Sequence, residues 1–182
     1  GREWCADLLG LYGDDQFGDV LVAALRDRED GVKRATARAL GRLKYEPAVK
    51  GLLKLRKSKD PRTRGNAIGS LAQINVEDQR DLCLDGIQKD RDPGVQCALL
   101  SMVPALLPDR CEALSTKAIS HEDWRPALQG VRNLGDIATK TSVDALVAAA
   151  TAARSRVSLE AVDMLVKLTD IKYSRADQWA SW

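Results

Sequence analysis

Few residues of this sequence are of the types that carry out chemistry. The only histidine is His121, and with Glu122 it forms the single His-Glu pair of the chain. A site for two iron ions would need several such pairs, so one pair excludes that chemistry. The four cysteines include no Cys-x-x-Cys pair. Because the chain has only one histidine in addition to these cysteines, we expect neither a zinc site nor a cofactor.

The cysteines and serines also lack the partners that make a nucleophile. A catalytic thiol or hydroxyl needs a base within reach, and the sequence offers no credible one. It contains no P-loop, dinucleotide-binding or nucleophile-elbow motif. We therefore interpret the cysteines as small core residues, with one disulfide as the alternative, and we expect no enzyme. They are Cys5, Cys83, Cys97 and Cys111.

Cations are concentrated in one segment of the chain. Between Arg26 and Arg64 there are 14 lysines and arginines and 5 acidic residues, a sum of +9. The whole chain carries +2, so the remainder sums to −7. The total points to neither nucleic acid nor membrane. The local excess, however, could bind carboxylates or phosphates, which guanidinium groups recognise as planar forks.

The composition predicts a helical protein. Aromatic residues are only 4% of the chain, and alanine and leucine, both strong helix formers, supply most of the apolar content. So few aromatics argue against a platform that stacks nucleic-acid bases. No apolar run approaches the roughly 20 residues of a membrane span. The first residue is glycine and not methionine, which suggests a trimmed start. We expect a cytoplasmic protein.

One motif recurs five times along the sequence. Each copy begins with a polar turn and an anchor residue, followed by a helical pattern with apolar residues eight and eleven positions after the anchor. The spacings between successive anchors are 31, 32, 31 and 31 residues. The anchors are Val32, Thr63, Val95, Pro126 and Val157. A fixed period of this length is typical of a stack of helical repeats.

Each repeat is predicted to hold two helices. The second begins near the anchor, where Asp60-Pro61 and Asp92-Pro93 place a capping carboxylate before a proline of the first turn. The third copy ends with Val103-Pro104-Ala105-Leu106 within the same helix. A shorter first helix precedes the second one in each repeat. Four of these are centred on residues 20–25, 48–55, 82–87 and 143–149.

The acid-Pro-x-Val-Arg start, the alanine-rich middle and the Leu-Gly end resemble the short HEAT-like repeats of the phycobilisome-lyase type. The resemblance covers residues 17–168. It implies an all-α, right-handed solenoid with the second helices on its concave side. We expect a single domain, 1–182, in which residues 1–16 and 169–182 are caps. Trp179 and Trp182 are interpreted as covering the last helix pair.

Applied to these residues, the resemblance places a basic stripe on the concave face. Arg34, Arg38 and Arg42 are spaced by four on one helix face, and Arg64 follows the second anchor. In this family an arginine at the position of Arg64 often pairs with acids of the neighbouring repeat. The additional basic residues expected to make contacts are Lys54, Lys57 and Arg62.

These residues lead to several hypotheses about function. The first is a non-catalytic scaffold or adaptor whose basic stripe binds an acidic segment of another protein, or a flanking segment of the same polypeptide. The second is binding of nucleic-acid phosphates through the same cations. The repeat type also leaves open a phycobilin-lyase-like enzyme. The cluster Asp123-Trp124-Arg125 leaves open a DNA-glycosylase-like one, although Asp123 is also the expected cap of its helix.

Overall fold

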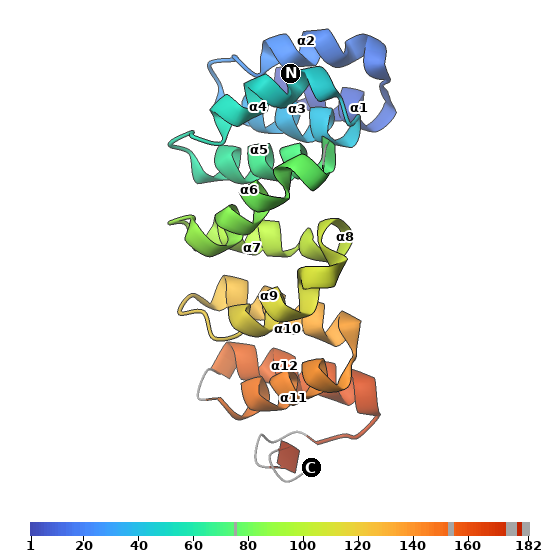
Figure 1. Cartoon of the computed structure of the whole chain (residues 1–182), viewed down its shortest axis with the longest axis vertical. Coiled ribbons are helices and arrows are strands. Elements are labelled where there is room, and N and C mark those ends of the chain that lie inside the picture. Colours follow the sequence, from blue (N-terminus) through green and yellow to red (C-terminus); the bar gives the residue numbers. More distant parts are fainter. Residues whose placement is uncertain (75, 153–154, 174–177, 180–182) are drawn as a thin grey trace. The chain divides into compact units, whose positions relative to one another are not determined.

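The computed structural model describes residues 1–74, 76–152, 155–173 and 178–179. These residues form twelve α-helices and two short 3-10 helices, with no strand among them (Figure 1). The prediction of an all-α fold is therefore confirmed. The handedness of the stack and the assignment of residues 1–182 to a single domain stay predictions.

The helices alternate between the first and second members of each repeat. The first members are α2 (Gly18–Ala24), α4 (Val49–Leu55), α6 (Val76–Lys89), α9 (Pro108–Ala118) and α11 (Lys140–Thr151). The second members are α3 (Asp30–Arg42), α5 (Pro61–Ile74), α7 (Pro93–Leu100) with α8 (Val103–Leu106), α10 (Trp124–Ile137) and α12 (Ser155–Thr169). A further helix, α1 (Arg2–Tyr12), precedes them, and η1 (Asp15–Phe17) and η2 (Glu46–Ala48) lead into α2 and α4.

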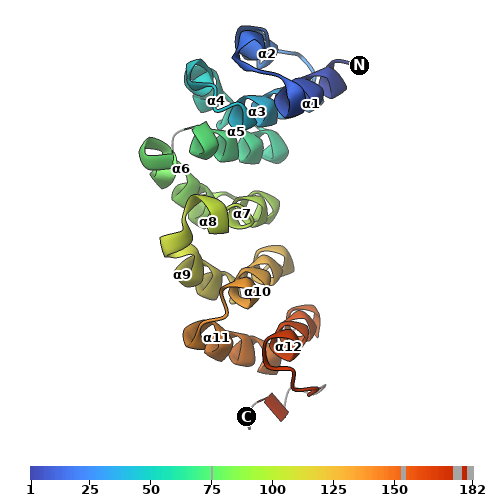
Figure 2. The same ribbon diagram turned by 90° about the vertical axis from the view of Figure 1, so that its right-hand side faces the viewer.

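The chain forms two compact units, residues 1–99 and 100–182. In the first unit α3 packs between α1 and α5, and α2 and α4 each pack on the second helix that follows them (Figure 2). In the second unit α10 packs against α9, α11 and α12. Each unit therefore repeats the same arrangement of one helix layer on another.

The core is built on the column eight residues after each anchor. All five residues of this column are 0% exposed, namely Leu40, Leu71, Val103, Leu134 and Leu165. Burial of one such side chain contributes about 1.5–3 kcal/mol relative to leaving it in water. The regular column explains why the period of the sequence predicted the helices so closely.

Aspartate side chains cap three of the second helices, α5, α7 and α10, as expected. Asp60 accepts hydrogen bonds from the backbone N–H and the hydroxyl of Thr63, at 2.8 and 2.6 Å. Asp92 accepts the N–H of Gly94 at 2.7 Å, and Asp123 accepts the N–H of Arg125 at 2.9 Å. These bonds satisfy donors that the first turn of a helix leaves unpaired. The predicted cap positions are confirmed.

The second helix of the third repeat differs from its prediction. It is interrupted at Ser101 and Met102, between α7 and α8. Pro104 lacks an N–H, and its ring clashes with the carbonyl four residues earlier, that of Leu100. The carbonyl oxygen of Leu100 is instead satisfied by the side-chain amide of buried Asn133, at 3.0 Å. A proline at this position therefore ends the helix that the apolar pattern alone predicted as continuous.

Described residues beyond α12 pack on the core of the second unit. Trp179 is buried in the core of that unit, and its ring meets Tyr173 edge to face with 5.2 Å between centroids. Its indole N–H donates to the carbonyl oxygen of Tyr173 at 3.3 Å. The interpretation of Trp179 as a covering residue is confirmed, whereas Trp182 lies outside the described residues.

The cysteines occupy different environments. Cys83 and Cys111 are buried, as expected for core residues, and burial raises the pKa of the Cys83 thiol to about 11. Cys5 is exposed on α1, so its assignment to the core was wrong. Cys97 is half-buried, and none of the four is in a disulfide.

Candidate basic binding site

Three of the four predicted stripe arginines are paired with carboxylates of neighbouring helices. Arg38 of α3 reaches Asp7 of α1 at 2.9 Å, and Arg34 reaches Asp60 at 3.2 Å. Each pair joins a second helix to the helix or turn of an adjacent repeat. These guanidinium groups therefore link neighbouring helices of the first unit. A ligand would have to compete with the carboxylates that already pair with them.

Arg64 is the most completely satisfied of these arginines. Its guanidinium donates two hydrogen bonds to the carboxylate of Asp90, at 2.9 and 2.8 Å. It also donates to the carbonyl oxygens of Ser58 and Lys59, both at 3.1 Å. The hydrogen bonds from Arg64 are the largest cause that lowers the pKa of Asp90. The pairing that the resemblance implied for Arg64 is confirmed.

The other predicted contact residues are exposed. Arg42 is the last residue of α3, and it has no ion-pair partner among the described residues. Lys54 lies on α4, Lys57 lies in the turn that follows, and Arg62 is the second residue of α5. The structure therefore separates the seven predicted residues into three that clamp repeats and four that face solvent.

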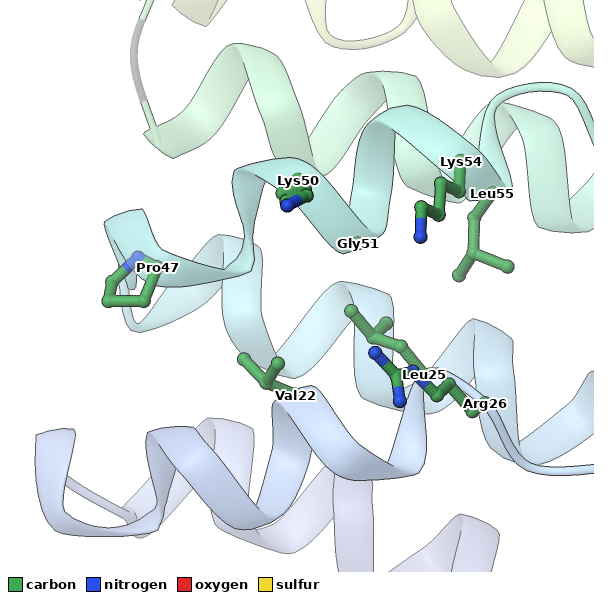
Figure 3. Close-up of a pocket in the computed structure, with 8 residues that line it drawn as sticks. All are labelled: Val22, Leu25, Arg26, Pro47, Lys50, Gly51, Lys54 and Leu55. Atoms are coloured by element: carbon green, nitrogen blue, oxygen red, sulfur yellow. The ribbon is translucent and has the colours of Figure 1, made fainter.

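One of the exposed residues, Lys54, lines a groove between α2 and α4 (Figure 3). The groove has a volume of about 420 Å³. Its apolar lining comes from Val22, Leu25, Pro47, Gly51 and Leu55, and its cations are Arg26, Lys50 and Lys54. None of these lining residues is acidic. The groove thus combines an apolar surface with three positive charges.

Local sequence explains both parts of this groove. Lys50 and Lys54 are four residues apart, so they lie on the same face of α4, with Gly51 between them. A side chain at Gly51 would meet Leu25, since a Cβ built there lies 2.6 Å from Leu25 Cδ1. Glycine at this position therefore lets α4 pack closely on Leu25, whose side chain fills the space that a Cβ would take. We call this site, made by the eight lining residues, the basic groove.

The end of the basic groove at η2 is fixed by Tyr45. Its hydroxyl donates to Asp19 of α2 at 2.8 Å, and this bond raises the pKa of Tyr45. The preceding Lys44 has a positive φ of 51°. It ends α3 with a bond from the N–H of Tyr45 to the carbonyl oxygen of Leu40, at 3.1 Å. The turn that follows α3 thus sets the position of η2 and α4 against α2.

The residues considered for catalysis have structural partners. Asp123 is bound to Arg125, and these hydrogen bonds lower the pKa of Asp123 to about 2. So weak a base is poorly matched to proton abstraction near neutral pH. The ring of Trp124 lies under the guanidinium of Arg156, 4.4 Å from its centroid. Among the described residues, no group of three or more His, Cys, Asp or Glu side chains lies where it could hold a metal ion.

Sequence reasoning named Lys54 but missed Arg26 and Lys50. Both belong to the basic segment, but neither lies on the predicted arginine stripe of α3 or in the predicted cluster that runs from Lys54 to Arg64. The signal that could have found them is the pair Lys50 and Lys54, at a spacing of four. If α2 and α4 had been predicted to be neighbours, Arg26 would also have been predicted to line the groove.

Comparison with known proteins identifies the type of repeat. Residues 18–103 match the family model described as HEAT repeats. No curated protein matches the chain. A crystal structure of an engineered protein is 20% identical, with 84% of this chain and 79% of that chain covered and a TM-score of 0.51. At this identity the likeness shows a shared fold alone.

Two further solved structures are similar at lower scores. The complex of CpcE and CpcF of phycocyanin lyase from Nostoc sp. PCC7120 is 20% identical over 99% of this chain and 86% of that chain, with a TM-score of 0.45. Another engineered protein is 18% identical over 83% and 80%, with a TM-score of 0.48.

The fold and the repeating core define an all-α solenoid of stacked helix pairs. Over residues 18–103, the match to HEAT repeats confirms the resemblance predicted from the sequence. None of the described helices has the length and apolar character that a membrane crossing requires.

Proposed function

We propose that this chain is a non-catalytic scaffold that binds an acidic segment of another protein. The observation that carries the proposal is the basic groove, in which Arg26, Lys50 and Lys54 surround an apolar surface without an acidic neighbour in the lining. Carboxylates of a partner would replace the water around these cations, and an apolar side chain between them would cover Val22 and Leu25. Such a combination gives both charge complementarity and apolar burial.

In this proposal the predicted cations have two tasks. Arg34, Arg38 and Arg64 hold neighbouring repeats together through their ion pairs. Arg42, Lys57 and Arg62 are exposed on the same unit and would extend the contact beyond the groove. Direct contact of the three clamping arginines with a partner stays a prediction. The expected concave position of the stripe likewise stays a prediction.

A binding titration tests the proposal. A fluorescein-labelled peptide with the core Glu-Glu-Leu-Glu-Glu is titrated with the full chain, with Lys50→Glu/Lys54→Glu, and with Lys140→Glu/Lys172→Glu. The last variant changes the net charge equally, at two exposed lysines of the second unit. We expect the groove variant to lose about tenfold or more in affinity, a difference of about 1.4 kcal/mol, and the control to stay within about twofold.

The same cations could instead bind phosphates, and the titration separates the two functions. A DNA duplex with the same label is titrated over a range of salt concentrations. Tighter binding of the duplex than of the peptide, with a steep loss as salt rises, would favour the phosphate-binding alternative. Equal affinity of the wild type and the groove variant for the peptide would overturn the proposed site.

A further inference from the structure

An acidic residue, Asp19, lies beside one end of the basic groove. It stands three residues before Val22, a spacing that places both side chains on one face of α2. Val22, Pro47 and Lys50 lie towards one end of the groove, and Arg26 lies towards the other (Figure 3). Since α2 runs from the first end to the second, the turn that carries Asp19 continues its wall beyond Val22.

The carboxylate of Asp19 is held by Tyr45. The hydroxyl of Tyr45 donates to Asp19 Oδ1 at 2.8 Å. The tyrosine ring lies against the first turn of α2, because a Cβ built on Gly18 would lie 2.3 Å from Tyr45 Cε2 and Cζ. Neither Asp19 nor Tyr45 lines the groove. The hydrogen bond therefore holds an acid of the α2 wall outside the groove.

The groove cations have no comparable partner. Among the described residues, none of Arg26, Lys50 and Lys54 forms an ion pair. Lys50 is the second residue of α4 and is exposed. It is also the cation at the end from which the Asp19 turn extends (Figure 3). A released Asp19 carboxylate would therefore meet Lys50 first.

We propose that Tyr45 is a positioning residue of the basic groove, whose hydroxyl holds Asp19 and keeps this carboxylate from pairing with Lys50. Without the hydroxyl, the ammonium group of Lys50 is the donor to which the carboxylate turns. The internal ion pair then competes with the carboxylates of a partner for the same cation. The effect on binding rests on the function proposed above, whereas the pairing of Asp19 does not.

The raised pKa of Tyr45 agrees with this arrangement. The hydrogen bond to Asp19 is its largest cause, followed by burial and by the charges of Asp19 and Asp15. The hydroxyl therefore keeps its proton at neutral pH and remains a donor to Asp19.

Zero-length crosslinking tests the pairing without a partner. A carbodiimide joins a carboxylate to an amine when the two are in contact, and mass spectrometry identifies the linked residues. We expect a crosslink between Asp19 and Lys50 in Tyr45→Phe and none in the wild type. Tyr12→Phe removes the hydroxyl of a tyrosine that is 85% exposed on α1, and it should behave as the wild type. The same yield in the wild type and Tyr45→Phe, zero included, would contradict the proposal.

A titration with the fluorescein-labelled Glu-Glu-Leu-Glu-Glu peptide tests the consequence for binding. Tyr45→Phe should weaken the peptide by about three- to fivefold, the scale of one exposed ion pair. Tyr45→Phe/Asp19→Asn lacks the competing carboxylate and should return to within about twofold of the wild type. Tyr45→Phe/Asp15→Asn removes an acid of η1 instead and should stay as weak as Tyr45→Phe.

The rescue separates positioning from a merely structural role. If Tyr45→Phe only loosened η2 and α4, the added Asp19→Asn would not restore binding, and that result would overturn the proposal. Equal rescue by Asp15→Asn would also overturn it, since net charge alone would then set the affinity. A wild type that does not bind the peptide would contradict the proposed function, and the crosslink would still decide whether Tyr45 keeps Asp19 from Lys50.

Discussion

Whether an arginine of the basic segment links repeats or faces solvent depends on whether a carboxylate lies within reach of it. Arg64 and Arg42 both lie at the ends of second helices in the same basic segment, and sequence reasoning assigned both to one binding surface. Asp90 of the next repeat accepts hydrogen bonds from the guanidinium of Arg64, whereas Arg42 has no ion-pair partner among the described residues. The residue type therefore indicated the chemistry, but only the stacking of repeats showed which arginines are already paired.

The pair of Arg64 and Asp90 predicts a measurable loss of stability. Arg64→Ala removes two charge-assisted hydrogen bonds in a site where both side chains are mostly buried, and it also leaves two carbonyl oxygens without their donor. We expect the free energy of unfolding to fall by about 1–3 kcal/mol in urea denaturation at neutral pH. Lys89→Ala breaks a solvated pair with Asp85 and should cost less than about 0.5 kcal/mol.

The same pair predicts a dependence on pH. Arg64 holds the pKa of Asp90 below its ordinary value of 3.8, so the folded state binds this proton less readily than the unfolded state. The stabilisation is complete above about pH 4 and is lost as the pH falls through the lower folded pKa. The difference in unfolding free energy between wild type and Asp90→Asn should therefore shrink in denaturation curves below pH 4. A constant difference down to pH 2 would show that the ion pair does not supply it.

Elements of this fold were predicted well because one apolar column recurs in every repeat. The column from Leu40 to Leu165 and the aspartate caps were predicted from the spacing of residues in the sequence. The structure confirms both. The break between α7 and α8 was not predicted, since the apolar pattern continues through Pro104.

The glycines show which helices are in very close contact and which are only neighbours at ordinary distance. A Cβ at Gly41 would lie 2.9 Å from the backbone of Ser70, whereas one at Gly65 would find its nearest atom 3.6 Å away, at Val95. Both glycines lie inside helices, where alanine is intrinsically favoured by about 1 kcal/mol. Gly41→Ala should therefore lose about 1–3 kcal/mol by overpacking.

Gly65→Ala is the matched control for this effect. It should gain up to about 1 kcal/mol, because the added methyl makes only ordinary contacts and the helix propensity rises. Urea denaturation of the two variants measures both changes. If Gly41→Ala were as stable as Gly65→Ala, α3 and α5 could not approach each other as closely as described here.

At the scale of the whole molecule, the repeats create surfaces that no single repeat contains. The basic groove requires α2 of one repeat and α4 of the next, and its cations come from both. The sequence could predict that cations gather between residues 26 and 64, but not which of them line a groove. That selection depends on which helices become neighbours, and on Gly51, where the missing side chain lets Leu25 pack closely on α4.

The central claim is that carboxylates of a partner pair with the cations of the basic groove, and a charge exchange tests it most directly. Lys50→Glu/Lys54→Glu is titrated with two peptides, one with the core Glu-Glu-Leu-Glu-Glu and one with the core Lys-Lys-Leu-Lys-Lys. We predict that the variant loses the acidic peptide and gains the basic one, while wild type shows the opposite preference. If wild type and variant show the same preference between the two peptides, the acidic partner does not bind in this groove.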